Sequence, residues 1–118
     1  MAYDQNNIFA KILRGEIPSA KVFENDHVLA FNDIAEKAPV HVLIIPKGAY
    51  ESFADFSQHA SEEEIVSLNR AIGEIAREKG IVETGYRVIS NHGVHARQEV
   101  PHYHVHLLGG DDLGGCFN

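Results

Sequence analysis

The chain has 118 residues and a formal net charge of −7 at neutral pH, which argues against a protein that binds nucleic-acid polymers. Such proteins usually carry a basic stripe, because neutralising phosphates supplies most of their affinity. Hydrophobic residues make up 44% and charged residues 23%, as in an ordinary globular domain. We expect one domain with one modest core over residues 1–118, preceded by a polar arm at 1–7 and ended by a tail at 111–118.

Cysteine usage and the distribution of apolar residues indicate the compartment. Cys116 is the chain's one cysteine, so no disulfide can form within the chain, which fits a reducing environment. The first residues are polar and show no basic stretch followed by an apolar one, so the sequence predicts no signal peptide. The most apolar stretch, 40–46, contains a histidine and is far too short to span a bilayer. We therefore expect a cytoplasmic protein without a membrane partner.

The first half of the chain shows one pattern of helical spacing and three short β-prone runs. The helical pattern stops at Gly15, and the turn sequence Asn25-Asp26 separates two of the runs, which predicts a hairpin. The third run is apolar and is closed by proline, as expected of a buried strand. In chain order we expect a helix over 8–13 beginning near Asn6 or Asn7, strands over 20–24 and 28–31, and a strand over 41–46.

The second half contains the longest helix. Ser61 followed by Glu64 has the form of a capping box, and Gly80 is a typical helix end. The apolar stripe between them consists of Ile65, Leu68, Ile72 and Ile75. Strands over 86–90 and 100–108 follow, joined by a polar loop at 91–97. The order of elements predicts an α+β fold, a mostly antiparallel five-stranded sheet with two helices packed on it.

Three histidines occupy alternate positions of the last predicted strand. Because successive side chains of a strand point to opposite faces, His102, His104 and His106 are expected on one face. Tyr103, Val105 and Leu107 are then expected on the other face, buried against a helix. Serine or threonine would serve the fold equally well at the first three positions. The pattern therefore points to a chemical use of imidazole.

Four interpretations of this pattern compete. It could be a solvated polar face, a metal-binding tag, a catalytic metal site, or a site for metal-free phosphoryl chemistry. Alternate histidines can ligate zinc, but His102 and His106 would lie about 13 Å apart on an unbent strand, and no acidic partner follows at short spacing. A neutral imidazole is a good nucleophile towards phosphorus, and flanking imidazoles can bind phosphate oxygens or move protons. We favour the last interpretation.

The sequence resembles the histidine-triad (HIT) family, and within it the Hint branch. The resemblance is carried by His102-Tyr-His104-Val-His106-Leu-Leu and by four further segments, and it runs in register from about Ile8 to Gly110. The further segments are Phe23-Glu-Asn-Asp26, Leu29-Ala-Phe-Asn-Asp-Ile34, Ala38-Pro-Val-His-Val-Leu-Ile-Ile-Pro-Lys47 and Gly85-Tyr-Arg-Val-Ile-Ser-Asn91.

The resemblance implies a fold, an assembly and an activity. The implied fold is a five-stranded antiparallel sheet that a homodimer continues into ten strands. The implied activity is hydrolysis of purine nucleotide phosphoramidates, such as adenosine monophosphate joined to an amine, without a cofactor or metal. Two alternatives stay open: a dinucleoside polyphosphate hydrolase or nucleotidyl transferase, and a nucleotide-binding regulatory protein with weak catalysis. A metal enzyme is a more distant alternative.

The resemblance also implies roles for individual residues. His104 would be the nucleophile, His106 would bind the α-phosphate, and His102 would orient and tune the site, together with His41. Asp33 would take the ribose hydroxyls, with Phe31 and Ile34 beside the base. Without the resemblance, Asp33 and Asn91 would be interpreted as turn residues and His41 as a core histidine. The implied contacts on the phosphate side are Asn91, Arg97, Gln98 and Glu99.

The chain departs from the pattern at two loop positions and in its tail. Ala96-Arg97 stands where Hint-like proteins commonly carry Gly-Gly, so a Cβ can crowd a phosphate there, although Arg97 can itself pair with phosphate. Glu99 stands where some members have serine, so its backbone is the better candidate for a phosphate contact. The tail at 111–118 lacks the tryptophan and prolines that relatives often place near the partner's active site. These departures concern substrate preference.

Overall fold

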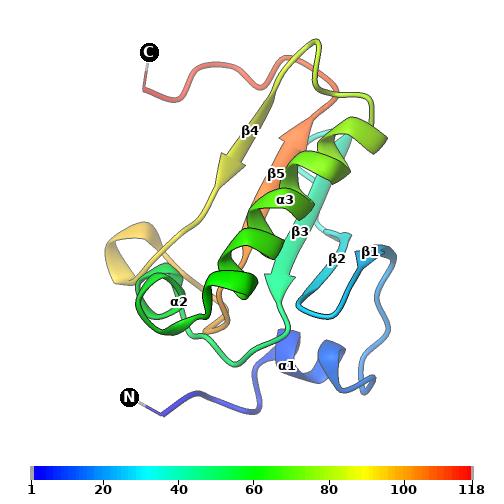
Figure 1. The fold of residues 1–118 in the computed structure, drawn as a ribbon. Helices are drawn as coiled ribbons and strands as arrows, with labels where there is room; N and C mark the ends of the chain where they lie inside the picture. Colours follow the sequence, from blue (N-terminus) through cyan, green and yellow to red (C-terminus); the bar gives the residue numbers. More distant parts are fainter. Residues whose placement is uncertain (1, 118) are drawn as a thin grey trace.

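A computed structural model describes residues 2–117 of the chain. Figure 1 shows its helices and strands, and the ends of the expected arm and tail, Met1 and Asn118, lie outside the described residues. The elements are, in chain order, α1 (Ile8–Leu13), β1 (Lys21–Glu24), β2 (Val28–Asn32), β3 (Val40–Pro46), α2 (Phe53–His59), α3 (Glu62–Glu78), β4 (Tyr86–Ile89), a 3₁₀ turn (Val94–Ala96) and β5 (Val105–Gly109).

The five strands form one antiparallel sheet in the order β1-β2-β3-β5-β4. The last strand of the chain therefore lies inside the sheet, between β3 and β4, and the two edges are β1 and β4. This topology confirms the predicted α+β architecture. It also places the histidines of β5 beside β3, the strand that carries His41.

One face of the sheet carries the main hydrophobic core. In Figure 1, α3 lies in front of the sheet and runs along β3 and β5. Its buried residues Leu68 and Ile75 pack with Val42 and Ile44 of β3 and with Leu107 of β5. Ile65 and Ile72 lie partly buried against the same cluster, so the predicted apolar stripe is the face that covers the sheet. We call this side of the sheet the helix face.

The opposite face carries a smaller core and the histidines. Phe9 of α1 packs there with the alternate residues of β2 and β3, which are Leu29, Phe31, Leu43 and Ile45. We call this side the histidine face. In Figure 1, α1 lies at the lower end of the sheet.

The predicted helix ends are confirmed in detail. Asn7 caps α1, its side chain accepting the N–H of Ala10 at 2.9 Å, and Ser61 and Glu64 form the complete capping box of α3. Gly80 follows α3 with φ +69°, where its N–H bonds to Arg77 O and the next N–H, of Ile81, bonds to Ala76 O. This pair of bonds satisfies the last carbonyls of the helix, and only glycine takes that backbone conformation without strain.

Two expectations about the elements were wrong. The structure has a third α-helix, α2, which the sequence pattern did not reveal because seven residues are too few to establish a helical period. The strand predicted over 100–108 covers only Val105–Gly109. Pro101 has no N–H to donate, and Tyr103 N donates to Tyr50 O at 2.7 Å instead of to a neighbouring strand. His102 and His104 therefore precede the strand.

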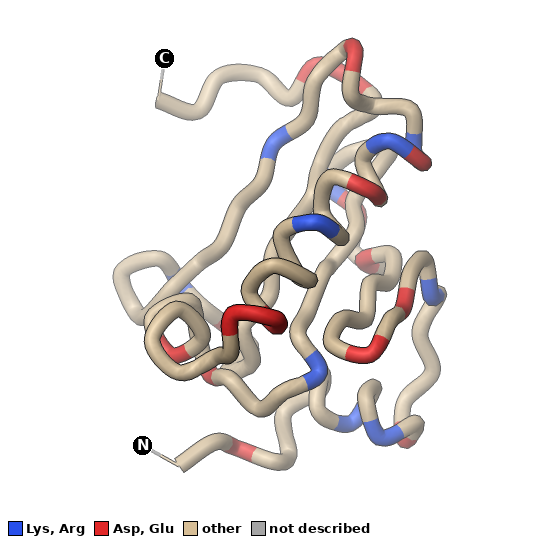
Figure 2. The backbone as a smooth tube through the Cα atoms, viewed as in Figure 1, with Lys and Arg blue, Asp and Glu red and all other residues tan. Residues whose placement is uncertain are grey.

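The distribution of charged residues and the lengths of the helices concern binding to nucleic acids and to membranes. Figure 2 shows Lys and Arg positions scattered along the chain and interleaved with Asp and Glu positions. Within residues 2–117, no helix has both the length and the apolar character needed to cross a membrane.

Candidate active site

A cavity of about 680 Å³ opens on the histidine face. This volume is in the range of sites that bind small molecules. Its walls come from α1, from the segment before β1, from β2 and β3 with their connection, from β4 and β5, and from the loop before β5. Of the expected site residues, the cavity is lined by Phe31, Asp33, Ile34, His41, Asn91, Arg97, Gln98, Glu99, His104 and His106.

The floor of the cavity includes a row of residues paired across four strands. Phe31 of β2 pairs with Leu43 of β3, Leu43 pairs with His106 of β5, and His106 pairs with Ile89 of β4. Since directly paired residues of a sheet share a face, all four side chains are presented to the histidine face. His106 thus lies between two aliphatic neighbours, on a surface fixed by the sheet itself.

His104 lines the cavity with one nitrogen already engaged. Its ring is buried, and Nδ1 lies 2.7 Å from the backbone carbonyl of His102. A carbonyl can only accept a hydrogen bond, so Nδ1 carries the proton and Nε2 keeps its lone pair. Phe9 packs edge-on against the ring, with centroids 5.0 Å apart. The fold therefore holds His104 in the tautomer that a nucleophile requires.

His41, His106 and Asp33 form a second connected group. The backbone N–H of Lys37 donates to Nδ1 of His41 at 3.1 Å, so the neutral ring carries its proton on Nε2. That Nε2 lies 2.9 Å from Nδ1 of His106 and 3.4 Å from Oδ2 of Asp33. His106 then accepts at Nδ1 and keeps a proton on Nε2. His106 is in the tautomer that donates a hydrogen bond to a ligand.

His102 is fully buried and does not line the cavity. Its Nε2 donates to Pro46 O at 2.8 Å, and its Nδ1 bonds to the hydroxyl of Tyr3. The expectation that all three rings share one surface reached by a ligand therefore holds for His104 and His106. His102 is connected to the cavity through His104, whose Nδ1 donates to the backbone carbonyl of His102.

Burial keeps the three rings neutral at pH 7. Desolvation lowers the pKa of His102 to about 4, against the opposing hydrogen bond to Pro46. Desolvation, with smaller contributions from the neighbouring His104 and His41, lowers the pKa of His106 to about 4. Desolvation also lowers the pKa of His104, although the hydrogen bond to His102 and the charge of Asp33 oppose it. Neutral imidazoles are the forms that attack phosphorus or donate through one nitrogen.

Asp33 and Ile34 stand at the start of the connection from β2 to β3. Asp33 Oδ1 accepts the N–H of Ala35 at 2.8 Å, so this residue does make the turn contact that a purely structural interpretation expects. Its Oδ2 faces His41. Ile34 is 100% exposed, although it is a large aliphatic residue. An exposed aliphatic wall beside buried Phe31 suits the flat face of a base.

The loop before β5 lines the cavity on its other side. Arg97 is the one non-glycine residue of 2–117 with a positive φ, at +58°, in the left-handed region. Gln98 is occupied with the loop itself: it accepts from Gly93 N and donates to Glu51 O and Val100 O. The backbone N–H of Gln98 also donates within the loop, to Gly93 O at 3.1 Å, whereas the exposed Arg97 and Glu99 keep their side chains on the cavity rim.

Sequence reasoning missed several residues of the site. Phe9 covers His104, and Tyr3 bonds to His102, although both belong to the N-terminal region, far along the chain from the triad. Leu43, Ile89 and Lys37 line the cavity. The apolar side of α1 was a usable signal for Phe9, because it had to be buried somewhere. No local pattern indicates Tyr3.

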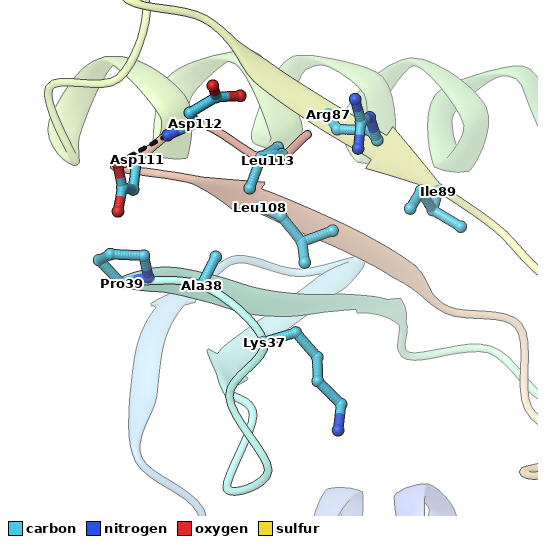
Figure 3. Close-up of a pocket in the computed structure, with 9 residues that line it drawn as sticks. All are labelled: Lys37, Ala38, Pro39, Arg87, Ile89, Leu108, Asp111, Asp112 and Leu113. Carbon is cyan, nitrogen blue, oxygen red and sulfur yellow. Dashed lines mark hydrogen bonds between the residues drawn. The ribbon is translucent and has the colours of Figure 1, made fainter. Parts of the chain in front are cut away.

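A smaller cavity of about 280 Å³ adjoins the first one. The two share Lys37, Ile89 and Leu108 in their walls. Figure 3 shows Arg87 and Ile89 on β4 and Asp111 and Asp112 on the tail, with the bond from Asp112 N to Asp111 Oδ1 at 2.8 Å. Arg87 also donates to Gly114 O at 2.9 Å, which ties the tail to β4.

Asp33, His41 and His106 also offer three atoms that lie within 4.8 Å of one another, close enough to hold a metal ion. The acidic partner that the strand sequence lacked is thus supplied by the end of β2. However, a metal bound at His41 needs the Nε2 lone pair, and the N–H of Lys37 fixes the proton on that nitrogen. The donor set as folded is therefore poorly arranged for a cation.

Comparisons with known proteins agree with this geometry. The HIT domain family model matches residues 14–113. A 13.2 kDa HIT-like protein of Azospirillum brasilense is 58% identical over 112 residues, which cover 95% of this chain and 92% of the relative. The purine nucleoside phosphoramidase of Escherichia coli K12 is 44% identical over 110 residues, which cover 93% and 92%.

Solved structures give the same result for the fold. A histidine triad protein from Clostridium difficile superposes with a TM-score of 0.86 at 46% identity, covering 98% of this chain and 99% of the other. A HIT family hydrolase from Legionella pneumophila superposes with a TM-score of 0.85 at 40% identity, covering 91% and 95%.

Proposed function

This chain belongs to the HIT domain family, and we propose that it hydrolyses purine nucleoside phosphoramidates through a covalent nucleotidyl-histidine on His104. The observation that carries the proposal is the state of His104: a buried neutral ring lining a 680 Å³ cavity, whose Nδ1–H is bound to His102 O. That bond leaves Nε2 as the nucleophilic atom. The similarity to a purine nucleoside phosphoramidase supports the substrate class.

The first step forms a bond from His104 Nε2 to the α-phosphorus and breaks the bond from phosphorus to the amine nitrogen. An amine leaves poorly unless it takes a proton. His106 Nε2–H is a donor that the hydrogen-bond pattern leaves available in the cavity, and His41 Nε2–H can resupply His106 through the 2.9 Å contact. The positive charge that develops on the His104 ring is stabilised by the carbonyl of His102, which accepts from Nδ1.

The second step is attack of water on the same phosphorus. The bond to His104 Nε2 breaks and the nucleoside monophosphate leaves. The proton that water loses returns to the pair His41 and His106, which gave a proton to the amine in the first step. The net change is therefore one water added across the bond between phosphorus and nitrogen. No step requires an oxidant, a reductant or any co-reactant other than water.

The nucleoside part would bind at the end of β2. The carboxylate of Asp33 can accept hydrogen bonds from two vicinal ribose hydroxyls, with Phe31 and Ile34 beside the base. The phosphate would then face His104, His106 and the loop that contains Asn91, Arg97 and Glu99. The guanidinium of Arg97 offers a paired donor to a phosphate oxygen.

The direct test is an intact-mass spectrum of protein quenched during turnover of an adenosine phosphoramidate. A mass increase equal to one adenylyl group is expected, and the His104→Ala protein should show neither the adduct nor turnover while still binding adenosine monophosphate. Near-normal turnover by His104→Ala would overturn the assignment of the nucleophile.

The same assay separates the alternative functions. Faster turnover of a diadenosine polyphosphate than of the phosphoramidate would favour a polyphosphate hydrolase. Tight binding of the monophosphate with turnover at background would favour a regulatory nucleotide-binding protein. Loss of activity with a chelator, restored by a divalent cation, would favour a metal site at Asp33, His41 and His106.

We propose a homodimer in the cytoplasm as the working form. Two features of β4 support the assembly: it is an edge strand, and Tyr86 and Val88 on it are 40% and 48% exposed. Joining two such edges would continue the sheet into ten strands. A molar mass of one chain by light scattering, at concentrations where activity is measured, would overturn the dimer.

A further inference from the structure

The N-terminal arm reaches the least accessible histidine of the triad. The hydroxyl of Tyr3 bonds to Nδ1 of His102 across 99 positions of the sequence. The two rings also meet edge to face, with centroids 5.6 Å apart and an interplanar angle of 73°. The arm therefore packs against His102 and does not extend into solvent.

The direction of this hydrogen bond follows from the other nitrogen of the ring. His102 Nε2 lies 2.8 Å from Pro46 O, and a carbonyl can only accept, so Nε2 carries the proton of the neutral ring. Nδ1 then has only a lone pair, and the Tyr3 hydroxyl must donate to it. His102 is 0% exposed, so loss of this donor leaves a buried acceptor that bulk water does not reach.

The arm is fixed to α1 by its own hydrogen bonds. Asp4 O accepts from the side chain of Asn7 at 2.7 Å, and Asp4 Oδ1 accepts from Asn6 N at 2.9 Å. Asn7 is in turn the cap of α1, which carries Phe9 against both His102 and His104. Tyr3 is thus held at a defined place relative to the histidines.

His102 transmits this contact to the proposed nucleophile. Its ring is bonded at both nitrogens, to Tyr3 and to Pro46, while its backbone carbonyl accepts from Nδ1 of His104 at 2.7 Å. A change in the ring position of His102 therefore acts on the carbonyl that sets the tautomer and orientation of His104. This arrangement resembles the outer hydrogen bonds that orient ligand histidines in metal enzymes.

We propose that Tyr3 is a positioning residue of the active site, whose hydroxyl fixes the His102 ring and thereby holds His104 for attack. The catalytic part of this inference rests on the proposed function. The structural part, the Tyr3–His102 bond and the Nε2–H tautomer of His102, is independent of which substrate the protein takes.

The test is the Tyr3→Phe variant, which removes one oxygen and keeps the ring that packs against His102. We expect kcat for the adenosine phosphoramidate to fall about 10-fold, with KM changed less than twofold, because orientation of the nucleophile is affected and substrate binding is not. Tyr50→Phe, which removes a hydroxyl that bonds to Glu64 away from the cavity, is the matched control and should leave both constants unchanged.

A spectroscopic measurement keeps the result separate from the fate of the proposed function. In protein with ¹⁵N-labelled histidine, the two ring nitrogens of His102 should show the Nε2–H tautomer, and Tyr3→Phe should shift the Nδ1 resonance of His102. If wild type has no turnover but the shift occurs, the proposed function fails and the Tyr3–His102 contact stands. An unchanged spectrum, or a lower melting temperature with unchanged kcat per folded molecule, would overturn the positioning role.

Discussion

The two faces of the sheet bury their residues for different purposes. The helix face is covered by α3 and α2 and contains apolar side chains in its buried cluster, among them Ile44, Leu68, Ile75 and Leu107. The histidine face is covered only in part by α1 and contains imidazoles that each have at least one ring nitrogen bonded to a specific partner. The helix face stabilises the fold by burying apolar surface. The hydrogen bonds of the histidine face determine which nitrogen of each imidazole carries the proton.

This difference predicts that stability and chemistry separate by face. Residues of one strand, such as His106 and Leu107, are neighbours in sequence but contribute to different faces. Substitutions on the helix face should therefore change the free energy of unfolding, and substitutions on the histidine face should change turnover. The predictions below test that separation, beginning with the largest expected effect.

His106→Ala should reduce kcat for the phosphoramidate by about 10²- to 10⁴-fold, the range typical of a lost proton donor. The side chain is only half-buried, so the urea midpoint should change little. Steady-state kinetics and urea titration of the same preparation measure the two quantities. A large loss of stability with intact turnover per folded molecule would contradict the separation of stability and chemistry between the two faces.

Leu68→Ala should lower the free energy of unfolding by about 2–5 kcal/mol, because Leu68 is 1% exposed and its removal leaves a cavity beneath α3. Values of kcat and KM for the molecules that remain folded should stay within about twofold of wild type. Val66→Ala, at a 49% exposed position of the same helix, is the control and should cost well under 1 kcal/mol. Equal losses in both variants would contradict the assignment of the core.

Stability should fall as the pH drops from about 6.5 towards 4, because desolvation lowers the pKa values of His102 and His106 from 6.5 to about 4. In that pH range these histidines bind protons in the unfolded chain and stay neutral in the folded chain. Stability that is present above pH 6.5 is therefore lost on acidification. For fully buried His102 the loss is about 3 kcal/mol, and His106, being half-buried, adds less.

Urea midpoints at pH 7.5 and 5 measure the part of this loss that falls above pH 5, where most carboxylates do not titrate. The helix face contributes no histidine to its buried cluster, so the effect should come from the other face. A constant midpoint between these two pH values would show that the folded protein binds protons at these rings as readily as the unfolded chain does.

Arg97→Gly should have the smallest effect on stability and should raise it by about 0.5–1 kcal/mol, because a side chain in the left-handed region costs roughly 1–2 kcal/mol and glycine loses more chain entropy on folding. If Arg97 binds phosphate, KM should rise severalfold in the same variant. Arg97→Asn, which tolerates that backbone conformation and removes the guanidinium, separates the two effects. An unchanged KM in both variants would remove Arg97 from the substrate contacts.

Local signals were sufficient for most of the fold. The capping box of Ser61 and Glu64 and the glycine after α3 are short-range features, and the structure confirms them. The alternation that put Tyr103, Val105 and Leu107 on one face also holds, although the regular strand begins only at Val105. Alternation reports the direction of side chains, whereas strand bounds depend on partners that the local sequence does not specify.

The site was less accessible to local reasoning. The triad predicted imidazole chemistry, but the ring of His102 lies outside the cavity, and one of the two bonds that orient it comes from Tyr3. The N–H of Lys37 that fixes the proton of His41 is another contact set by chain path rather than by periodicity. Tautomers follow from partners, and the partners had to be seen in three dimensions.

The cross-strand pairing of Phe31, Leu43, His106 and Ile89 determines what an error in strand register would do to the protein. A slip of β5 by one position against its neighbours would turn His106 into the helix core and bring Leu107 to the cavity floor. Such a misfolded molecule would bury a polar ring among aliphatic side chains and would also remove the proposed proton donor from the cavity. On the proposed mechanism, a molecule is active only if β5 has the correct register. The active fraction of a preparation therefore measures the fraction of molecules that folded correctly.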